Sequence, residues 1–122
     1  MYPSLFVRRR SPQATVQVTG EIDLNSAPWV QEQLLRILRA SGHRLLVDLS
    51  GVSFIDCAGL RMLLGTCRRA DQQAGSVAFV AVSGHVRRLA ELTGQMEAIP
   101  LTSPGAARYG EYAAQPPVLR PA

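Results

Sequence analysis

The residues of this 122-residue chain whose types and spacing could do chemistry lie in FIDCAGLRML, residues 54–63. Asp56 follows an apolar pair, Cys57 and Ala58 come next, and Gly59 precedes a helical pattern. This order predicts the end of a strand and the N-terminus of a helix, where free backbone N–H groups favour a carboxylate. We therefore interpret Asp56 as the N-cap of that helix.

A second acid, Asp23, lies in the loop GEIDLN, residues 20–25. Two carboxylates brought together could perform acid–base catalysis, but the sequence supplies no further residues of an active site around them. We therefore interpret Asp23 as a candidate partner contact, and we expect that the chain is not an enzyme.

Cys57 could be a nucleophile or a redox sensor, because a helix N-terminus lowers the pKa of a thiol. No feature of the sequence supplies a general base or a resolving cysteine for it. Cys67 lies ten residues further along the same predicted helix, roughly 15 Å away and beyond the reach of a disulfide. A small enzyme or redox protein built on Cys57 stays open as an alternative, and two unpaired thiols fit a reducing compartment.

Composition argues against several other classes of protein. The net charge is +4 and all the basic residues are arginines, but they are dispersed and lack interleaved aromatic residues, so we expect no nucleic-acid surface. No apolar run approaches the roughly 20 residues that span a bilayer, and no secretory leader follows the N-terminus, so we expect a cytoplasmic protein. His43 and His85 have no metal-ligand spacing, and no P-loop or GxGxxG is present; we expect neither metal nor cofactor.

Apolar periodicity and turn residues predict alternating strands and helices. We expect strands over residues 4–9, 14–19, 45–49, 76–82 and 99–101, and helices after Ser26, over 58–74 and after Ser83. Ser26 and Ser83 would cap their helices, and Gly42, Gly75 and Gly94 would end them. This order predicts an α/β fold with a mostly parallel sheet of four to five strands flanked by three to four helices. Residues 1–103 would form one domain, and 104–122 a weak helix and a disordered tail.

Three segments, in this order and spacing, carry a resemblance to a known family. GEIDLNSA, VDLSGVSFIDCAGLRMLL and SGHVRRLAELTG resemble the STAS domain family, and above all its bacterial branch of anti-sigma factor antagonists. The resemblance covers about residues 4–103 and implies partner switching. An unphosphorylated domain of this kind binds an anti-sigma factor, often a serine kinase, and so frees a sigma factor; phosphorylation reverses the binding.

The resemblance also places the phosphoacceptor on the residue before the motif's glycine, which here is Ala58. Alanine has no hydroxyl, so we expect that phosphorylation at this position does not switch the protein. Ser50 and Ser53 could be minor sites of modification, although nothing in the sequence marks them. The chain would then be a binding-competent antagonist, or a scaffold that has left the pathway.

The predicted helix over residues 58–74 offers a candidate partner face. If Leu60, Leu63, Leu64 and Cys67 face the core, the opposite stripe combines small residues, methionine and arginine, which suit an interface. With the neighbouring loops, the expected partner-binding residues are Asp23, Asn25, Asp56, Cys57, Ala58, Gly59, Arg61, Met62, Gly65 and Arg69. A STAS accessory subunit that binds the ATPase of an ABC-type lipid or solute transporter is the alternative, and a homodimer stays open.

Overall fold

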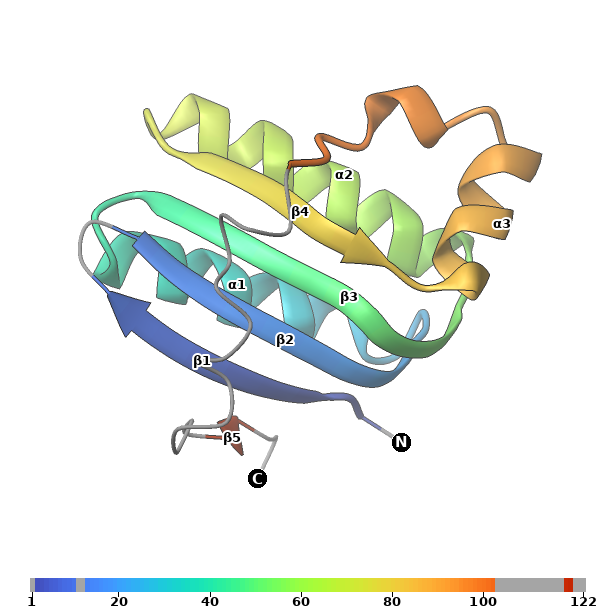
Figure 1. The fold of residues 1–122 in the computed structure, drawn as a ribbon, viewed down its shortest axis with the longest axis horizontal. Helices are drawn as coiled ribbons and strands as arrows, with labels where there is room; N and C mark the ends of the chain where they lie inside the picture. The colour runs from blue at the N-terminus through green and yellow to red at the C-terminus, as the bar shows by residue number, and fades with distance from the viewer. Residues whose placement is uncertain (1, 11–12, 103–117, 120–122) are drawn as a thin grey trace.

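A computed structural model of the chain describes residues 2–10, 13–102 and 118–119, in which strands and helices alternate (Figure 1). The strands are β1 Ser4–Arg10, β2 Gln13–Ile22, β3 Arg44–Ile55, β4 Ser76–Val82 and β5 Val118–Leu119. The helices are α1 Ala27–Ala40, α2 Cys57–Gln72, α3 Gly84–Leu92 and the short 3₁₀ helix η1 Met96–Ala98. The predicted α/β class is confirmed.

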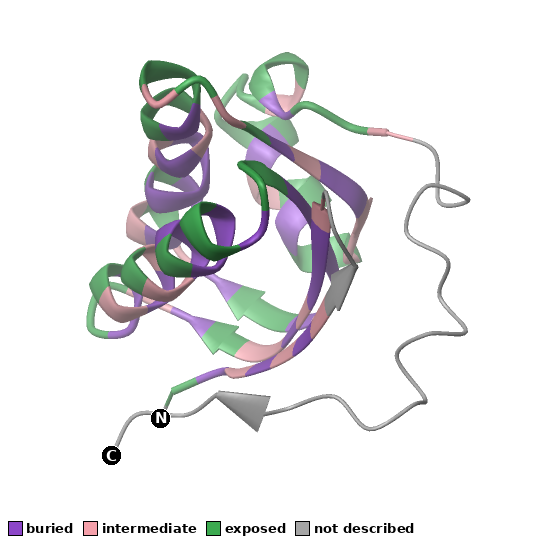
Figure 2. Cartoon of the chain, turned by 90° about the vertical axis from the view of Figure 1, so that its left-hand side faces the viewer, coloured by how far each residue is buried: buried purple, intermediate pink, exposed green. Residues whose placement is uncertain are grey.

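The sheet has the strand order β4-β3-β2-β1-β5. The pairs β2–β3 and β3–β4 are parallel, whereas β1 runs antiparallel to both of its neighbours. Helices α1 and α2 each connect one parallel pair, and both connections step across the sheet in the same direction. Right-handed crossovers therefore bring both helices to one face of the sheet, as Figure 2 shows. The carboxyl ends of β2 and β3 lie at the same edge, where α1 and α2 begin.

The main core lies between that face of the sheet and the helices. Alternate strand residues meet apolar residues of the three helices there; the largest fully buried side chains include Phe79, Ile22, Leu34, Ile37, Leu38, Leu49 and Leu63. Residues 45–49 are all buried, as predicted. Leu45, Val47 and Leu49 belong to the main core, and Leu46 forms a second small cluster with Val80 and Ala78.

The predicted strand at Ile99–Leu101 is wrong in extent. Residues 96–98 form η1, and only Leu101 makes an isolated parallel bridge, to Phe79 on β4. The N–H of Phe79 donates to the carbonyl of Pro100 at 2.8 Å, and the N–H of Thr102 donates to the carbonyl of Phe79 at 2.9 Å. Since Pro100 has no N–H to donate, it cannot continue a ladder.

The C-terminal residues 118–119 form β5, which pairs with β1 through Leu5↔Leu119 and Phe6↔Val118. Sequence reasoning predicted no strand in this stretch. The weak helix and the disordered tail predicted for residues 104–122 otherwise lie outside the described residues.

Candidate functional site

The β3–α2 junction is held by the carboxylate of Asp56. Its Oδ1 accepts a hydrogen bond from the N–H of Gly59 at 2.8 Å, which confirms the predicted N-cap. Its Oδ2 accepts another from the N–H of Leu24 at 3.0 Å, in the β2–α1 loop. One side chain therefore satisfies a free N–H of α2 and fixes a loop that is 32 residues away in the sequence.

The β2–α1 loop is closed internally by Asp23 and Ser26. The carboxylate of Asp23 accepts from the N–H of Ser26 at 2.9 Å, and the hydroxyl of Ser26 accepts from the N–H of Asp23 at 3.0 Å. The bond from the Ser26 N–H lowers the pKa of the Asp23 carboxyl, because it favours the charged form. Ser26 occupies the N-cap position of α1, as predicted, but its hydroxyl turns back into the loop and makes no capping bond to the helix.

Gly59 lets α2 approach the end of β2. A Cβ at this position would lie 2.8 Å from Cγ1 of Ile55 and 2.9 Å from both Cγ2 and the carbonyl oxygen of Ile22. No side chain fits at such distances without a shift of the backbone. The glycine of the motif is therefore required by packing, independently of any partner.

Ala58 lies in a shallow hollow of about 260 Å³ between the β2–α1 loop and the first turns of α1 and α2. The hollow is lined by Leu24, Ala27, Pro28, Gln31, Ala58 and Met62. No acid is among these lining residues. Leu24 stands at its rim with 71% of its surface exposed, held by the bond from its N–H to Asp56. The position that the resemblance assigns to a phosphoacceptor thus has an apolar surrounding.

Met62 does not lie on an exposed face, and this part of the prediction is wrong. Its side chain is only 7% exposed and belongs to the core. Helix α1 covers it: the amide Nε2 of Gln31 donates to the carbonyl of Met62 at 3.4 Å and to the hydroxyl of Thr66 at 3.3 Å. Helix α2 is therefore buried on two sides, against the sheet and against α1, and a single buried stripe does not describe it.

The other predicted stripe residues, Gly65, Arg69 and Arg61, also do not share one exposed face. Gly65 is half-buried and faces α1, since a Cβ there would lie 3.5 Å from Nε2 of Gln31. Arg69 is exposed and lines a different hollow from that of Ala58, together with residues of α1. Arg61 instead lines a groove on the other side of α2, together with Cys57. The members of the predicted stripe therefore have different surroundings, and Arg69 lies in the last turn of α2, away from the loops at the start of the helix.

The two thiols differ in their surroundings. Cys57 is exposed, whereas Cys67 is partly covered, and both are free. The Cys67 thiol points toward the carbonyl of Val77 at 3.9 Å, and burial raises its pKa to about 11. This thiol therefore stays protonated at neutral pH. In the described part of the chain, no three metal-ligating side chains come together.

Sequence reasoning missed Leu24 and the second bond of Asp56. A signal for Leu24 was available: it is an apolar residue between Asp23 and Asn25 in a loop that is otherwise polar. Asn25 itself is exposed, and its carbonyl accepts a bond from the Tyr2 hydroxyl at 3.4 Å. The link from Asp56 to Leu24 joins two distant segments, so local spacing could not indicate it.

Comparison with known proteins agrees with this architecture. The family model for the STAS domain matches residues 6–104. The anti-sigma-B factor antagonist of Bacillus subtilis is 32% identical over 97 residues, which cover 80% of this chain and 88% of that protein. The crystal structure of an anti-sigma factor antagonist from Mycobacterium paratuberculosis superimposes with a TM-score of 0.68 at 30% identity, over 85% of this chain and 92% of that one.

A more distant structure shares the fold alone. A Thermotoga maritima protein, described as a putative anti-sigma factor antagonist, has a TM-score of 0.71 at 15% identity, over 89% of this chain and 94% of that one. Within the described residues, no helix is long and apolar enough to span a membrane.

Proposed function

Because the chain belongs to the STAS domain family, we propose that it is an anti-sigma factor antagonist. It binds an anti-sigma factor of the serine-kinase type in the cytoplasm and thereby frees a sigma factor. The names of the relatives support this role. Anti-sigma factor antagonists are regulators rather than enzymes, in agreement with the expectation that this chain is not an enzyme.

The observation that carries the proposal is the composite surface at the start of α2. The β2–α1 loop and the first turn of α2 are joined through Asp56, which accepts from the N–H of Leu24 and the N–H of Gly59. This arrangement presents the exposed Leu24 beside Ala58. An exposed apolar side chain on a fixed backbone suits a protein partner, because little conformational entropy is lost when it binds.

Ala58 makes the antagonist independent of phosphorylation at this position. A phosphate there would add almost two negative charges to the first turn of α2. It would also place them in a hollow lined by Leu24, Pro28 and Met62. Alanine instead adds a methyl group to this apolar surface, so that the chain stays in its binding form, and its activity follows its concentration.

The proposal is tested by titration calorimetry with the purified serine-kinase anti-sigma factor of the same genome. The wild type should bind, and Leu24→Asp and Ala58→Glu should each weaken the affinity by about tenfold or more, because both place a carboxylate in the apolar hollow. Leu101→Asp is the matched control: Leu101 is also exposed, at 47%, but does not line the hollow. Its affinity should equal that of the wild type.

Absence of binding by the wild type would contradict the antagonist role. If the immobilised wild type then retained a transport ATPase from the native lysate, the chain would be an accessory subunit of a transporter. If the wild type bound the anti-sigma factor and all three variants bound it equally well, the role would stand and the assigned surface would be wrong.

A further inference from the structure

A groove of about 340 Å³ runs along α2 on the side away from α1. Its floor is formed by Leu60 and Leu64, and the opposite wall by Thr93 and Gln95, which connect α3 to η1. The floor is apolar and the wall supplies polar groups. The proposed contact surface around Leu24 and Ala58 shares no residue with this groove, so a partner could occupy both.

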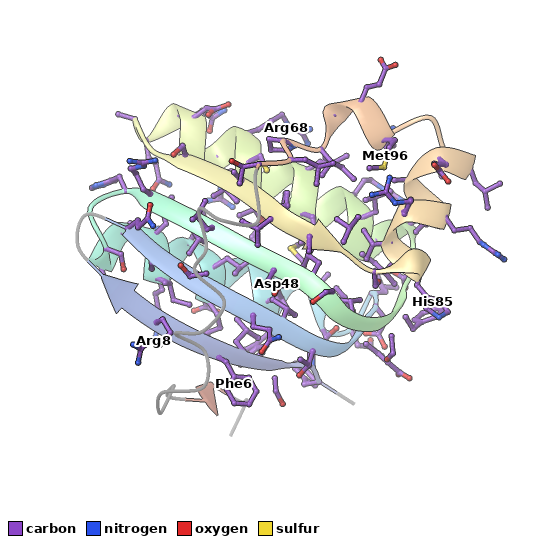
Figure 3. All side chains as sticks on the ribbon, in the orientation of Figure 1. Phe6, Arg8, Asp48, Arg68, His85 and Met96 are labelled. Carbon is purple, nitrogen blue, oxygen red and sulfur yellow. The ribbon has the colours of Figure 1, made fainter. Side chains whose placement is uncertain are left out.

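The groove carries positive charge. Arg61 and Arg68 line it, and both are exposed. Arg68 folds back along the helix, with Nη2 3.8 Å from where a Cβ of Gly65 would lie. Figure 3 shows Arg68 on the same upper side of the molecule as Met96 of η1. Among the described residues, the one ion pair joins Arg36 to Glu32, so the two groove arginines have no carboxylate partner in that part of the chain.

The dimensions of the groove suit a short peptide segment. Cys57 and Arg68 are the first and last lining residues along α2, and eleven residues of α-helix separate their backbones by roughly 16 Å. An extended segment of about five residues has this length. The groove also contains no aromatic residue among its lining residues, which disfavours a single-stranded nucleic acid that would need stacking surfaces.

The geometry points to a second docking site, in which this groove binds an acidic segment of the anti-sigma factor. Carboxylates of that segment pair with the guanidinium groups of Arg61 and Arg68, which favour bidentate contacts. An apolar side chain between them packs on Leu60 and Leu64. This inference rests on the proposed function and extends its interface across α2 toward α3 and η1.

The test compares two double charge reversals of equal size in the full chain. Arg61→Glu/Arg68→Glu changes the groove, whereas Arg87→Glu/Arg88→Glu changes two exposed arginines on α3 that do not line it. The probe is the purified serine-kinase anti-sigma factor of the same genome. The groove variant should lose about tenfold or more in affinity and the control less than about threefold, since only the first loses paired charges.

Two further measurements make the outcome specific. The affinity of the wild type should fall as salt is raised, and the groove variant should lose most of this dependence. In an amide NMR titration, the anti-sigma factor should shift the signals of Leu60, Leu64, Thr93 and Gln95. Denaturation profiles of both variants should match that of the wild type, because all four arginines are exposed.

The possible failures can be told apart. If the wild type does not bind the anti-sigma factor, the proposed function and this extension are both wrong. If it binds, but the groove variant binds as tightly as the control and the groove amides do not shift, only the second site is overturned. If the wild type forms a dimer that the groove variant alone dissolves, the occupant of the groove is a second copy of this chain, and the acidic partner segment is likewise overturned.

Discussion

Helices α2 and α3 both start with a side-chain N-cap, but only the cap of α2 also holds a neighbouring loop. In each, a side chain accepts from the N–H three residues later: Asp56 from Gly59 at 2.8 Å and Ser83 from Val86 at 3.4 Å. Only Asp56 has a second oxygen, which accepts from the N–H of Leu24. At the start of α3, Ser83 makes this one capping bond. The start of α2 is linked through Asp56 to the β2–α1 loop, and this difference creates the surface that we propose for a partner.

Glycine substitutions should give the largest contrast between the two helix starts. Gly59→Ala should destabilise the fold by about 2 kcal/mol or more, because its Cβ would press on Ile55 and on the backbone of Ile22. Gly84→Ala is the matched control in the first turn of α3. No atom lies within 4 Å of where a Cβ would lie at position 84. The higher helix propensity of alanine should therefore stabilise the protein by about 0.5 kcal/mol. Urea denaturation measures both changes, and equal effects would contradict the close approach at Gly59.

Removal of the caps should give the next contrast. Asp56→Ala should cost about 2 kcal/mol because two backbone N–H groups lose their acceptor, whereas Ser83→Ala should cost about 0.5–1 kcal/mol. Asp56→Ala should also free the β2–α1 loop, so that hydrogen exchange at the amide of Leu24 becomes faster. An equal loss of stability in both variants, with exchange at Leu24 unchanged, would show that the second bond of Asp56 has no role.

The rates at which the two thiols react should show that Cys57, at the start of α2, is exposed and that Cys67, ten residues later, is partly covered. At pH 8, a thiol reagent should modify Cys57 in the native protein. Cys67 should react far more slowly until the protein unfolds, since a pKa of about 11 leaves about one thiol in a thousand ionised. Cys57→Ser should abolish the fast phase. Two equal rates in the native protein would contradict the burial of Cys67.

The raised pKa of Cys67 also predicts a loss of stability in alkali. Below the ordinary thiol pKa of 9.0 both states keep the proton, and no penalty arises. As pH rises from 9.0 toward about 11, the unfolded chain releases this proton first, so the free energy of unfolding falls. Cys67→Ala should remove this part of the pH dependence; an unchanged alkaline profile would contradict the shift.

Much of the fold could be predicted from the sequence because local signals agree with one another. Alternating apolar residues mark β2, Pro28 lies in the first turn of α1, and Asp56 and Ser83 cap their helices. The short apolar run at 99–101 led to the wrong prediction of a full strand. Pro100 prevents a ladder there, and only the bridge from Leu101 to Phe79 forms.

The site was less predictable because it depends on contacts between distant segments. The burial of Met62 follows from α1 lying against α2, and a periodic pattern in one helix does not reveal a second neighbour. The bond between Asp56 and Leu24 crosses from one junction to the other. Asp56 could be named from the sequence, but its bond to Leu24 is a property of the folded chain.

The central claim is that the chain binds its anti-sigma factor without being switched at position 58. Intact-mass spectrometry and size-exclusion chromatography test it directly, with the serine-kinase anti-sigma factor, Mg²⁺ and ATP mixed with the wild type or with Ala58→Ser. We predict that the wild type stays unmodified and in complex, whereas Ala58→Ser gains one phosphate and dissociates. Phosphorylation and release of the wild type, for example at the exposed Ser53, would contradict the account.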